Sequence, residues 1–142
     1  MLQYRLEKEV SNKVMSLPLE ICQRLRNLLE ERPEISFAYL HSSFVEGPTF
    51  HDIDVAVYLD PLQSEPFDYE MGLSVELTRT LRLPVDIQVL NQAPLGFQHQ
   101  VLQGELLFAR DEVQLTDFIE YVANEYTAFA HFLPDYLEAV TT

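Results

Sequence analysis

The chain has 142 residues, of which 47% are hydrophobic and 23% are charged, so it can bury one core and most of it is not disordered. Its net charge of -14 disfavours direct binding to nucleic acid, because phosphate binding depends on cationic side chains. No apolar run is long enough to span a membrane, and the first residues lack the apolar segment of a signal peptide. We therefore expect a cytoplasmic protein.

The charge is distributed unevenly. Residues 1–50 carry six basic and seven acidic residues (net -1), whereas residues 51–142 carry three basic and 16 acidic residues (net -13). A basic protein partner or divalent cations would suit such a surface. The single cysteine, Cys22, lies between apolar residues, and we expect it to be packed in the core.

The first half of the chain predicts a helix followed by two strands. Apolar residues recur at helical spacing from Leu17 to Arg32, with Ser16 as the N-cap and Pro18 in the first turn. Ile35–Leu40 is expected to form a short strand. Ile53–Leu59 is apolar nearly throughout, which is typical of a strand covered on both faces. The intervening SSFVEGPTFH is too short for a full helix.

The second half alternates helices with strands and ends in a long helix. Glu65–Leu81 is expected to be helical, with apolar spacing at Phe67, Met71, Val75 and Leu81. The next expected elements are a strand over Pro84–Leu90, a short helix over Leu95–Leu102 and a strand in GELLFAR, after the turn residue Gly104. The final helix is expected from about Glu112 to Phe132, within a C-terminal helical region of about residues 112–138. These elements predict an α/β (α+β) fold, a mixed sheet of three to four strands flanked by helices.

Two acidic residues stand at the start of the second strand. Asp52 and Asp54 are two positions apart in HDIDVAVYLD, so their side chains point to the same face. Carboxylates held this close repel each other unless a cation lies between them, and oxygen ligands on a rigid strand suit Mg²⁺. The alternative is a strand end that is simply exposed to water.

A third carboxylate lies in the third predicted strand. Asp86 in VDIQVL stands among apolar residues, where a buried carboxylate without a partner would be costly. If this strand pairs with Ile53–Leu59, Asp86 joins Asp52 and Asp54 in one metal site. The alternative is again an exposed strand residue.

Small and hydroxyl residues precede the acidic pair. LHSSFVEG contains Ser42, Ser43 and Gly47 at a predicted strand-to-helix turn, where backbone N–H groups and hydroxyls can approach a phosphate. Serines in a turn are also ordinary helix N-caps.

The arrangement of AYLHSSFVEGPTFHDIDVAVYLD followed by VDIQVL resembles the nucleotidyltransferase superfamily of the DNA polymerase β type, over about residues 17–110. Members carry a Gly-Ser pair, an Asp-x-Asp and a third Asp on a later strand. With no added substrate domain, the whole of 1–142 resembles one minimal nucleotidyltransferase domain. The subgroup most similar to it is the antitoxin partner of HEPN ribonuclease toxins.

The resemblance implies an activity, its cofactors and its partner. By position, Asp52 and Asp54 correspond to ligands of two Mg²⁺ ions that bridge the triphosphate of ATP, and Asp86 to a ligand of the ion facing the acceptor hydroxyl. Ser42, Ser43 and Gly47 correspond to the nucleotide-binding turn, in which Ser43 contacts the terminal phosphates. The implied reaction transfers AMP from ATP to a tyrosine of a HEPN toxin, in a hetero-oligomer without membrane or nucleic acid.

The sequence departs from the family pattern at two positions. Ser42 stands where the family has glycine, and its Cβ can obstruct a phosphate; Glu46 stands where a basic residue is common. These departures favour an alternative, a degenerate antitoxin or binding module that neutralises its partner by occlusion. Transfer to a small molecule such as an aminoglycoside is less favoured, because only about 30 residues follow the last strand.

Three histidines and one aromatic segment are further candidates. His41, His51 and His99 are each possible ligands or bases, and His51, beside Asp52, is the best placed in sequence; surface or structural roles are the commoner alternative. Glu76 and Arg79 are expected to form a surface pair. The aromatic EYTAFAHFLPDYL is expected in the core or in an interface with a basic toxin.

Overall fold

The computed structural model describes residues 18–41 and 52–141, with side chains up to Phe132 and at Glu138. The helices are α2 (Leu19–Glu30), α3 (Pro66–Leu81), α4 (Leu95–Leu102) and α5 (Glu112–Thr141). The strands are β1 (Ile35–His41), β2 (Ile53–Leu59), β3 (Val85–Val89) and β4 (Glu105–Ala109). Among these residues no helix is both long enough and apolar enough to cross a membrane.

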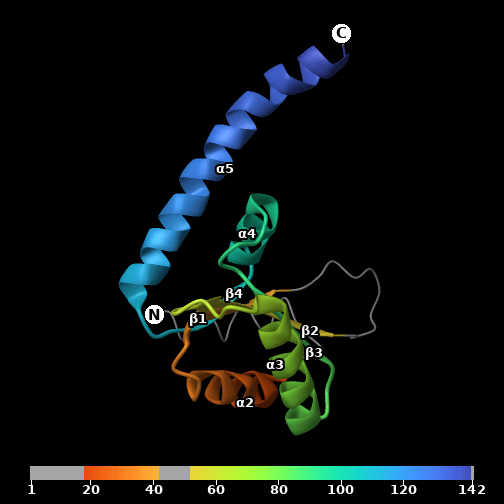
Figure 1. Ribbon diagram of the computed structural model, residues 1–142, viewed down its shortest axis with the longest axis vertical. Coiled ribbons are helices and arrows are strands. Elements are labelled where there is room, and N and C mark those ends of the chain that lie inside the picture. Colours follow the sequence, from red (N-terminus) through yellow and green to blue (C-terminus); the bar gives the residue numbers. More distant parts are fainter. Residues whose placement is uncertain (1–17, 42–51, 142) are drawn as a thin grey trace.

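The four strands form one mixed sheet in the order β3-β2-β1-β4. β1 is antiparallel to both β2 and β4, while β2 and β3 run parallel and are joined through α3. Figure 1 shows α2 and α3 on one side of the sheet and α4 and the start of α5 on the other. The predicted fold class and the mixed sheet of three to four strands are therefore confirmed.

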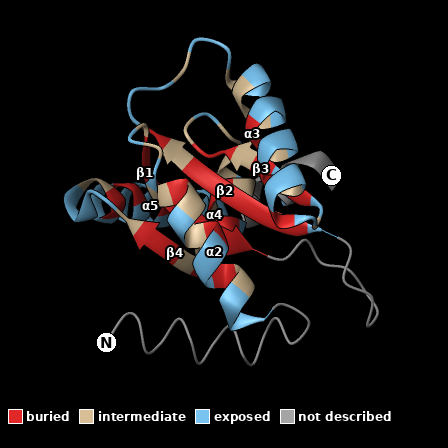
Figure 2. Ribbon diagram, turned by 90° about the horizontal axis from the view of Figure 1, so that it is seen from below, coloured by how far each residue is buried: buried red, intermediate tan, exposed pale blue. Residues whose placement is uncertain are grey.

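The sheet divides the core into two apolar layers. Along β2, Val55 and Val57 face α2 and α3, whereas Ala56 and Tyr58 face α4 and α5, as the period of two in a strand requires. Figure 2 shows the buried β1 and β2 between partly exposed helices. Because β2 is covered on both faces, nearly every residue in it is apolar, and Asp54 is the exception.

α3 covers the open edge of the sheet. Three of its polar side chains accept hydrogen bonds from outward N–H groups of β3: Thr78 from Val85 (2.9 Å), Ser74 from Ile87 (2.9 Å) and Glu70 from Val89 (2.7 Å). These side chains are four residues apart and thus share one helix face. The face satisfies backbone donors that an edge strand otherwise leaves unpaired, and it fixes the position of β3.

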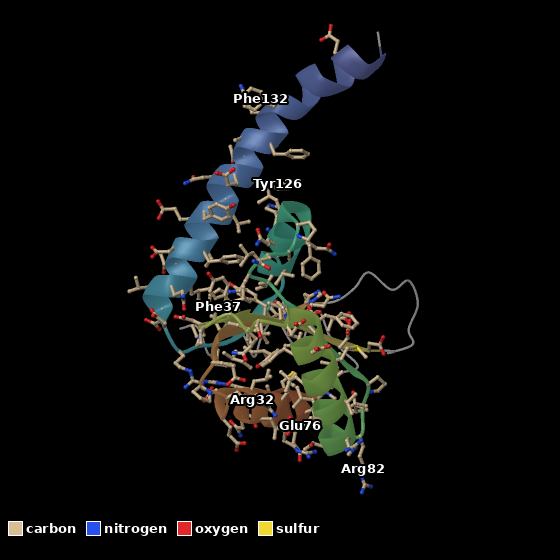
Figure 3. All side chains as sticks on the ribbon, in the orientation of Figure 1. Arg32, Phe37, Glu76, Arg82, Tyr126 and Phe132 are labelled. Carbon is tan, nitrogen blue, oxygen red and sulfur yellow. The ribbon has the colours of Figure 1, made fainter. Side chains whose placement is uncertain are left out.

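The apolar spacing predicted for this helix marks the wrong face. Phe67, Met71 and Val75 are exposed, at 69%, 52% and 48%. The buried apolar residues of α3 are Leu73, Leu77 and Leu81. The difference arises because α3 carries a second apolar stripe at the same spacing of four residues, and this stripe packs in the core; of the predicted residues, only Leu81 belongs to it. Glu76, expected to pair with Arg79, instead forms an ion pair with Arg32 at the end of α2 (Figure 3).

The first helix is shorter than predicted. α2 covers only the middle of Leu17–Arg32, and Pro18 occupies the N-cap position rather than the first turn. No side chain caps its N-terminus, and Ser16 lies outside the described residues. As predicted, Cys22 is buried, and burial raises the pKa of its thiol to about 11.

The remaining boundaries are close to prediction. β2 and α4 have the predicted ends, β1 includes one more residue (His41), and β3 and β4 are one residue shorter at each end than the predicted strands. α5 begins at Glu112 as predicted and ends at Thr141, slightly beyond the predicted region of about residues 112–138. SSFVEGPTFH lies outside the described residues.

Candidate active site

Two carboxylates lie side by side on the central and edge strands. Asp54 of β2 and Asp86 of β3 are direct partners in the parallel register, on the face of the sheet that α4 and α5 cover. The pairing that the sequence left open is therefore present. It places the two carboxylates on one face because partners in register share a face.

The two carboxylates have different surroundings. Asp54 is buried, with 7% of its surface exposed, whereas Asp86 is exposed on the edge strand. The sequence had left open a shared site or an exposed strand residue, and Asp86 is both paired with Asp54 and exposed, because β3 is an edge strand of the described sheet. Asp52 is also exposed and lies immediately before β2. The site thus opens to solvent on the side of Asp52 and Asp86.

Mutual repulsion links the three acidic residues. Desolvation raises the pKa of Asp86, and the negative charges of Asp54 and Asp52 raise it further, while His41 acts in the opposite direction. A divalent cation between these carboxylates would relieve the repulsion, and their oxygens are the hard ligands that Mg²⁺ prefers. The donor chemistry therefore fits a divalent cation.

The carboxylates among the described residues do not form a complete metal-binding site. Within residues 18–41 and 52–141, no three His, Cys, Asp or Glu side chains converge closely enough to hold a metal ion. The register partners Asp54 and Asp86 provide two oxygen donors on rigid strands. The phosphates of a bound substrate are a source of further oxygen ligands.

His41 is the histidine that the fold brings to the carboxylates. It ends β1, is the register partner of Asp54 and is 92% buried (8% exposed). Burial lowers the pKa of His41, and the charges of Asp54 and Asp86 oppose this effect. Its Nε2 is buried with no hydrogen-bond partner among the described residues. A buried polar atom without a partner is costly, as is usual where a ligand is to bind.

The other predicted histidines do not join this group. His99 of α4 stacks on Tyr126 of α5 with ring centroids 3.6 Å apart and planes 7° apart, a contact that holds the two helices together. His51, the preferred candidate in sequence, lies outside the described residues, as do Ser42, Ser43 and Gly47. The expected phosphate-binding turn thus stays a prediction.

α4 closes one side of the site. The ring of Phe97 meets the His41 ring edge to face, with centroids 5.5 Å apart. The buried Gln98 Nε2 donates a 2.9 Å hydrogen bond to the carbonyl of Leu90 and so ties α4 to the end of β3. At the other end of α4, a Cβ on Gly104 would lie 2.5 Å from the carbonyl oxygen of Leu40. Only glycine permits this close approach beside His41.

A pocket of about 480 Å³ adjoins the carboxylates along β3. Its polar members include Gln88, which shares the face of Asp86 and whose Nε2 lies 3.5 Å from Asp86 Oδ2, and Glu70. Its apolar members include Phe97, Leu62 and Pro94. A ligand bound at the carboxylates therefore has room to place a flat, largely apolar group in this pocket.

Sequence reasoning missed Gln88 and Phe97. Gln88 follows Asp86 by two residues, so strand alternation alone places it on the same face. Phe97 had no such signal, because its position depends on how α4 packs on the sheet. His41 was one of three candidate histidines, but the sequence could not single it out. Its place beside Asp54 depends on the register between β1 and β2.

The fold and the paired strand carboxylates define a protein of the nucleotidyltransferase class. The family described as polymerase beta, nucleotidyltransferase matches residues 23–113, more than half of the chain. The chain belongs to this family. A search of curated protein sequences found no match.

Solved structures of toxin–antitoxin complexes contain chains with this fold. A chain of the MntA–HepT toxin–antitoxin structure is 20% identical, with a TM-score of 0.64, and the match covers 85% of this chain and 97% of that one. A chain of the complex of the tri-AMPylated Shewanella oneidensis HEPN toxin with an MNT antitoxin is 20% identical, with a TM-score of 0.64. This match covers 85% of this chain and 99% of that one. A chain of a toxin–antitoxin structure with AMP-PNP is 21% identical, with a TM-score of 0.65, and the match covers 85% of this chain and 98% of that one.

Proposed function

We propose that this protein is the nucleotidyltransferase antitoxin of a HEPN ribonuclease toxin and transfers AMP from ATP to a tyrosine of that toxin. The observation that carries the proposal is the direct register of Asp54 and Asp86 within the family fold. The similar solved structures, which include an AMPylated HEPN toxin and a complex with AMP-PNP, support the same reaction.

In this reaction the tyrosine oxygen forms a bond with the α-phosphorus of ATP, and the bond to the β-phosphate oxygen breaks, releasing pyrophosphate. Asp54 and Asp86, with Asp52, are the residues that would hold Mg²⁺, which would supply charge neutralisation to the reaction. Asp86 lies on the side of the attacking tyrosine, as its position in the family pattern implies, and the tyrosine proton leaves to solvent. Phe97 and the pocket hold the adenine ring.

The phosphate side of the site is proposed by sequence position. Ser42, Ser43 and Gly47 follow the end of β1, where His41 is the register partner of Asp54. Because His41 precedes them directly, we propose that their hydroxyls and N–H groups bind the β- and γ-phosphates.

AMP transfer can be tested with the HEPN toxin by intact-mass measurement after incubation with ATP and Mg²⁺. The wild-type protein should add one or more AMP units to the toxin. Asp54→Asn should lower the rate at least about 100-fold, because charge stabilisation in the transition state is lost. Val113→Ala, a change on the exposed start of α5, is the control and should transfer normally. Undiminished transfer by Asp54→Asn would refute the proposed site.

A second function is neutralisation by occlusion without transfer. The observations that favour it are the absence of a converged three-ligand cluster among the described residues and Ser42 in the place of glycine. It predicts that Asp54→Asn still blocks toxin RNase activity. Loss of neutralisation by a variant that binds the toxin normally would exclude it.

A further inference from the structure

The last helix continues beyond the body that it covers. Leu115, Phe118 and Val122 of α5 are buried against the sheet and α4, and the Tyr126–His99 stack is its next contact with α4. Past this stack the helix leaves the rest of the molecule, as Figure 1 shows, and Figure 3 places Phe132 far out along it. Since the helix runs to Thr141, its outer part projects from the domain.

α5 carries exposed aromatic side chains both before the Tyr126 stack and beyond it. Tyr121, Phe129 and Phe132 are 56%, 53% and 65% exposed. With the exposed Ala128 they follow one another at spacings of seven, one and three residues, which places them on one side of the helix. We name these four residues the distal strip. Aromatic residues in a contiguous exposed patch are typical of protein interfaces.

The charge beside the distal strip indicates which kind of protein binds there. Asp117, Glu120 and Glu125 are exposed next to it, and the whole of residues 112–141 contains six acidic residues and no Lys or Arg. A second copy of this chain would bring an equally acidic helix, and a charge of -14, against the first. Like charges within a Debye length of about 10 Å repel, whereas a basic partner is attracted.

We propose that the distal strip is the docking site for a helix of a basic protein, whose apolar residues cover the aromatic side chains and whose Lys and Arg side chains meet Asp117, Glu120 and Glu125. This is helix-on-helix recognition through an apolar seam with charged flanks. The identity of the partner as the HEPN toxin rests on the proposed function. The strip lies on a different element from Asp54 and Asp86, so ATP binding at the carboxylates can be measured separately from docking.

The test measures the affinity of the HEPN toxin for three forms of the full chain by calorimetry. The double variant Phe129→Glu, Phe132→Glu should weaken binding at least about tenfold, because interface aromatics are common energetic anchors. The control is Phe67→Glu on α3, which changes an equally exposed phenylalanine (69%) and should bind as wild type. ATP titrations with Mg²⁺ should be the same for all three forms.

Each outcome has one meaning. Equal toxin binding by the double variant and wild type would overturn the docking site while leaving the proposed function intact. Failure of the wild type to bind the toxin would overturn both the partner and the proposed function. Light scattering on the isolated wild type should show a monomer; a dimer that the double variant abolishes would mean that a second copy occupies the strip, contrary to the proposal.

Discussion

Asp86 illustrates how one residue can favour function at the expense of stability. Desolvation, and then repulsion by Asp54 and Asp52, raise the pKa of its carboxyl in the folded state. The native protein therefore binds the proton more tightly than the unfolded chain, so stability falls as pH rises from the unfolded pKa through the folded one. At neutral pH the repulsion is fully present.

Asp86→Asn should consequently raise the melting temperature at pH 7. The gain is below about 1 kcal/mol because the side chain is exposed and its interactions are screened. Below the unfolded pKa of about 3.9 the gain should vanish, since the carboxyl is protonated in both states. Thermal melts of wild type and variant from pH 3.5 to 7.5 check this, and an equal difference at every pH would contradict it.

Gly104 is the residue on which the position of His41 most depends. Gly104→Ala should destabilise the protein by about 1–3 kcal/mol, because the new Cβ would meet the Leu40 carbonyl at 2.5 Å and lies 3.2 Å from the Cα of His41. Gly72→Ala on α3 is the matched control. A Cβ at Gly72 would meet nothing within 4 Å. Alanine in a helix should therefore raise the free energy of unfolding by about 0.5–1 kcal/mol. Urea denaturation measures both, and equal effects would refute the argument.

At this scale the sequence identifies what is local. Asp54 and Asp86 are visible because each is a charge in an apolar strand. His41 is harder to choose, since its place depends on the antiparallel register with Asp54. The preference for His51 followed adjacency in sequence to Asp52, which carries no information on that register.

At the scale of elements, the contact of α3 with β3 decides where Asp86 lies. Thr78 accepts from the N–H of Val85 at 2.9 Å and donates to the Val85 carbonyl at 3.3 Å, one residue before Asp86. Ser74 and Glu70 continue the contact along the strand. The helix thus replaces the missing neighbouring strand.

Thr78→Val should therefore cost about 1–3 kcal/mol, because it keeps the shape of the side chain but leaves the buried Val85 N–H without an acceptor. The Val85 amide should also exchange with solvent faster. Thr80→Val, an exposed change on the same helix, is the control. Unchanged exchange at Val85 in Thr78→Val would show that this hydrogen bond does not hold the strand.

The same contact explains which elements were predictable. β2 and α4 were predicted to the residue because their ends coincide with clear breaks in the apolar pattern. The buried face of α3 was not, because the helix carries two apolar stripes of equal spacing and only one of them packs in the core. The helix and strand pattern thus predicts where elements lie better than which face they bury.

For the whole molecule, the alternation of elements was enough to predict the fold class, and the three acidic residues were enough to identify the family. The projection of α5 was beyond sequence, because an apolar stripe has the same spacing whether the domain or a partner covers it. The distribution of charge helps to distinguish a stripe that the domain covers from one that a partner covers. The excess of acid after residue 50 lies partly on the carboxylate site and partly beside the distal strip.

The most direct test of the account is a calorimetric titration of ATP into the protein and into its complex with the toxin, with and without Mg²⁺. The account predicts binding that requires Mg²⁺ and is lost in the double variant Asp52→Asn, Asp54→Asn. Val113→Ala should bind as wild type. Binding that survives in the double variant, or the absence of binding to both the free protein and the complex, would contradict a nucleotide site at these carboxylates.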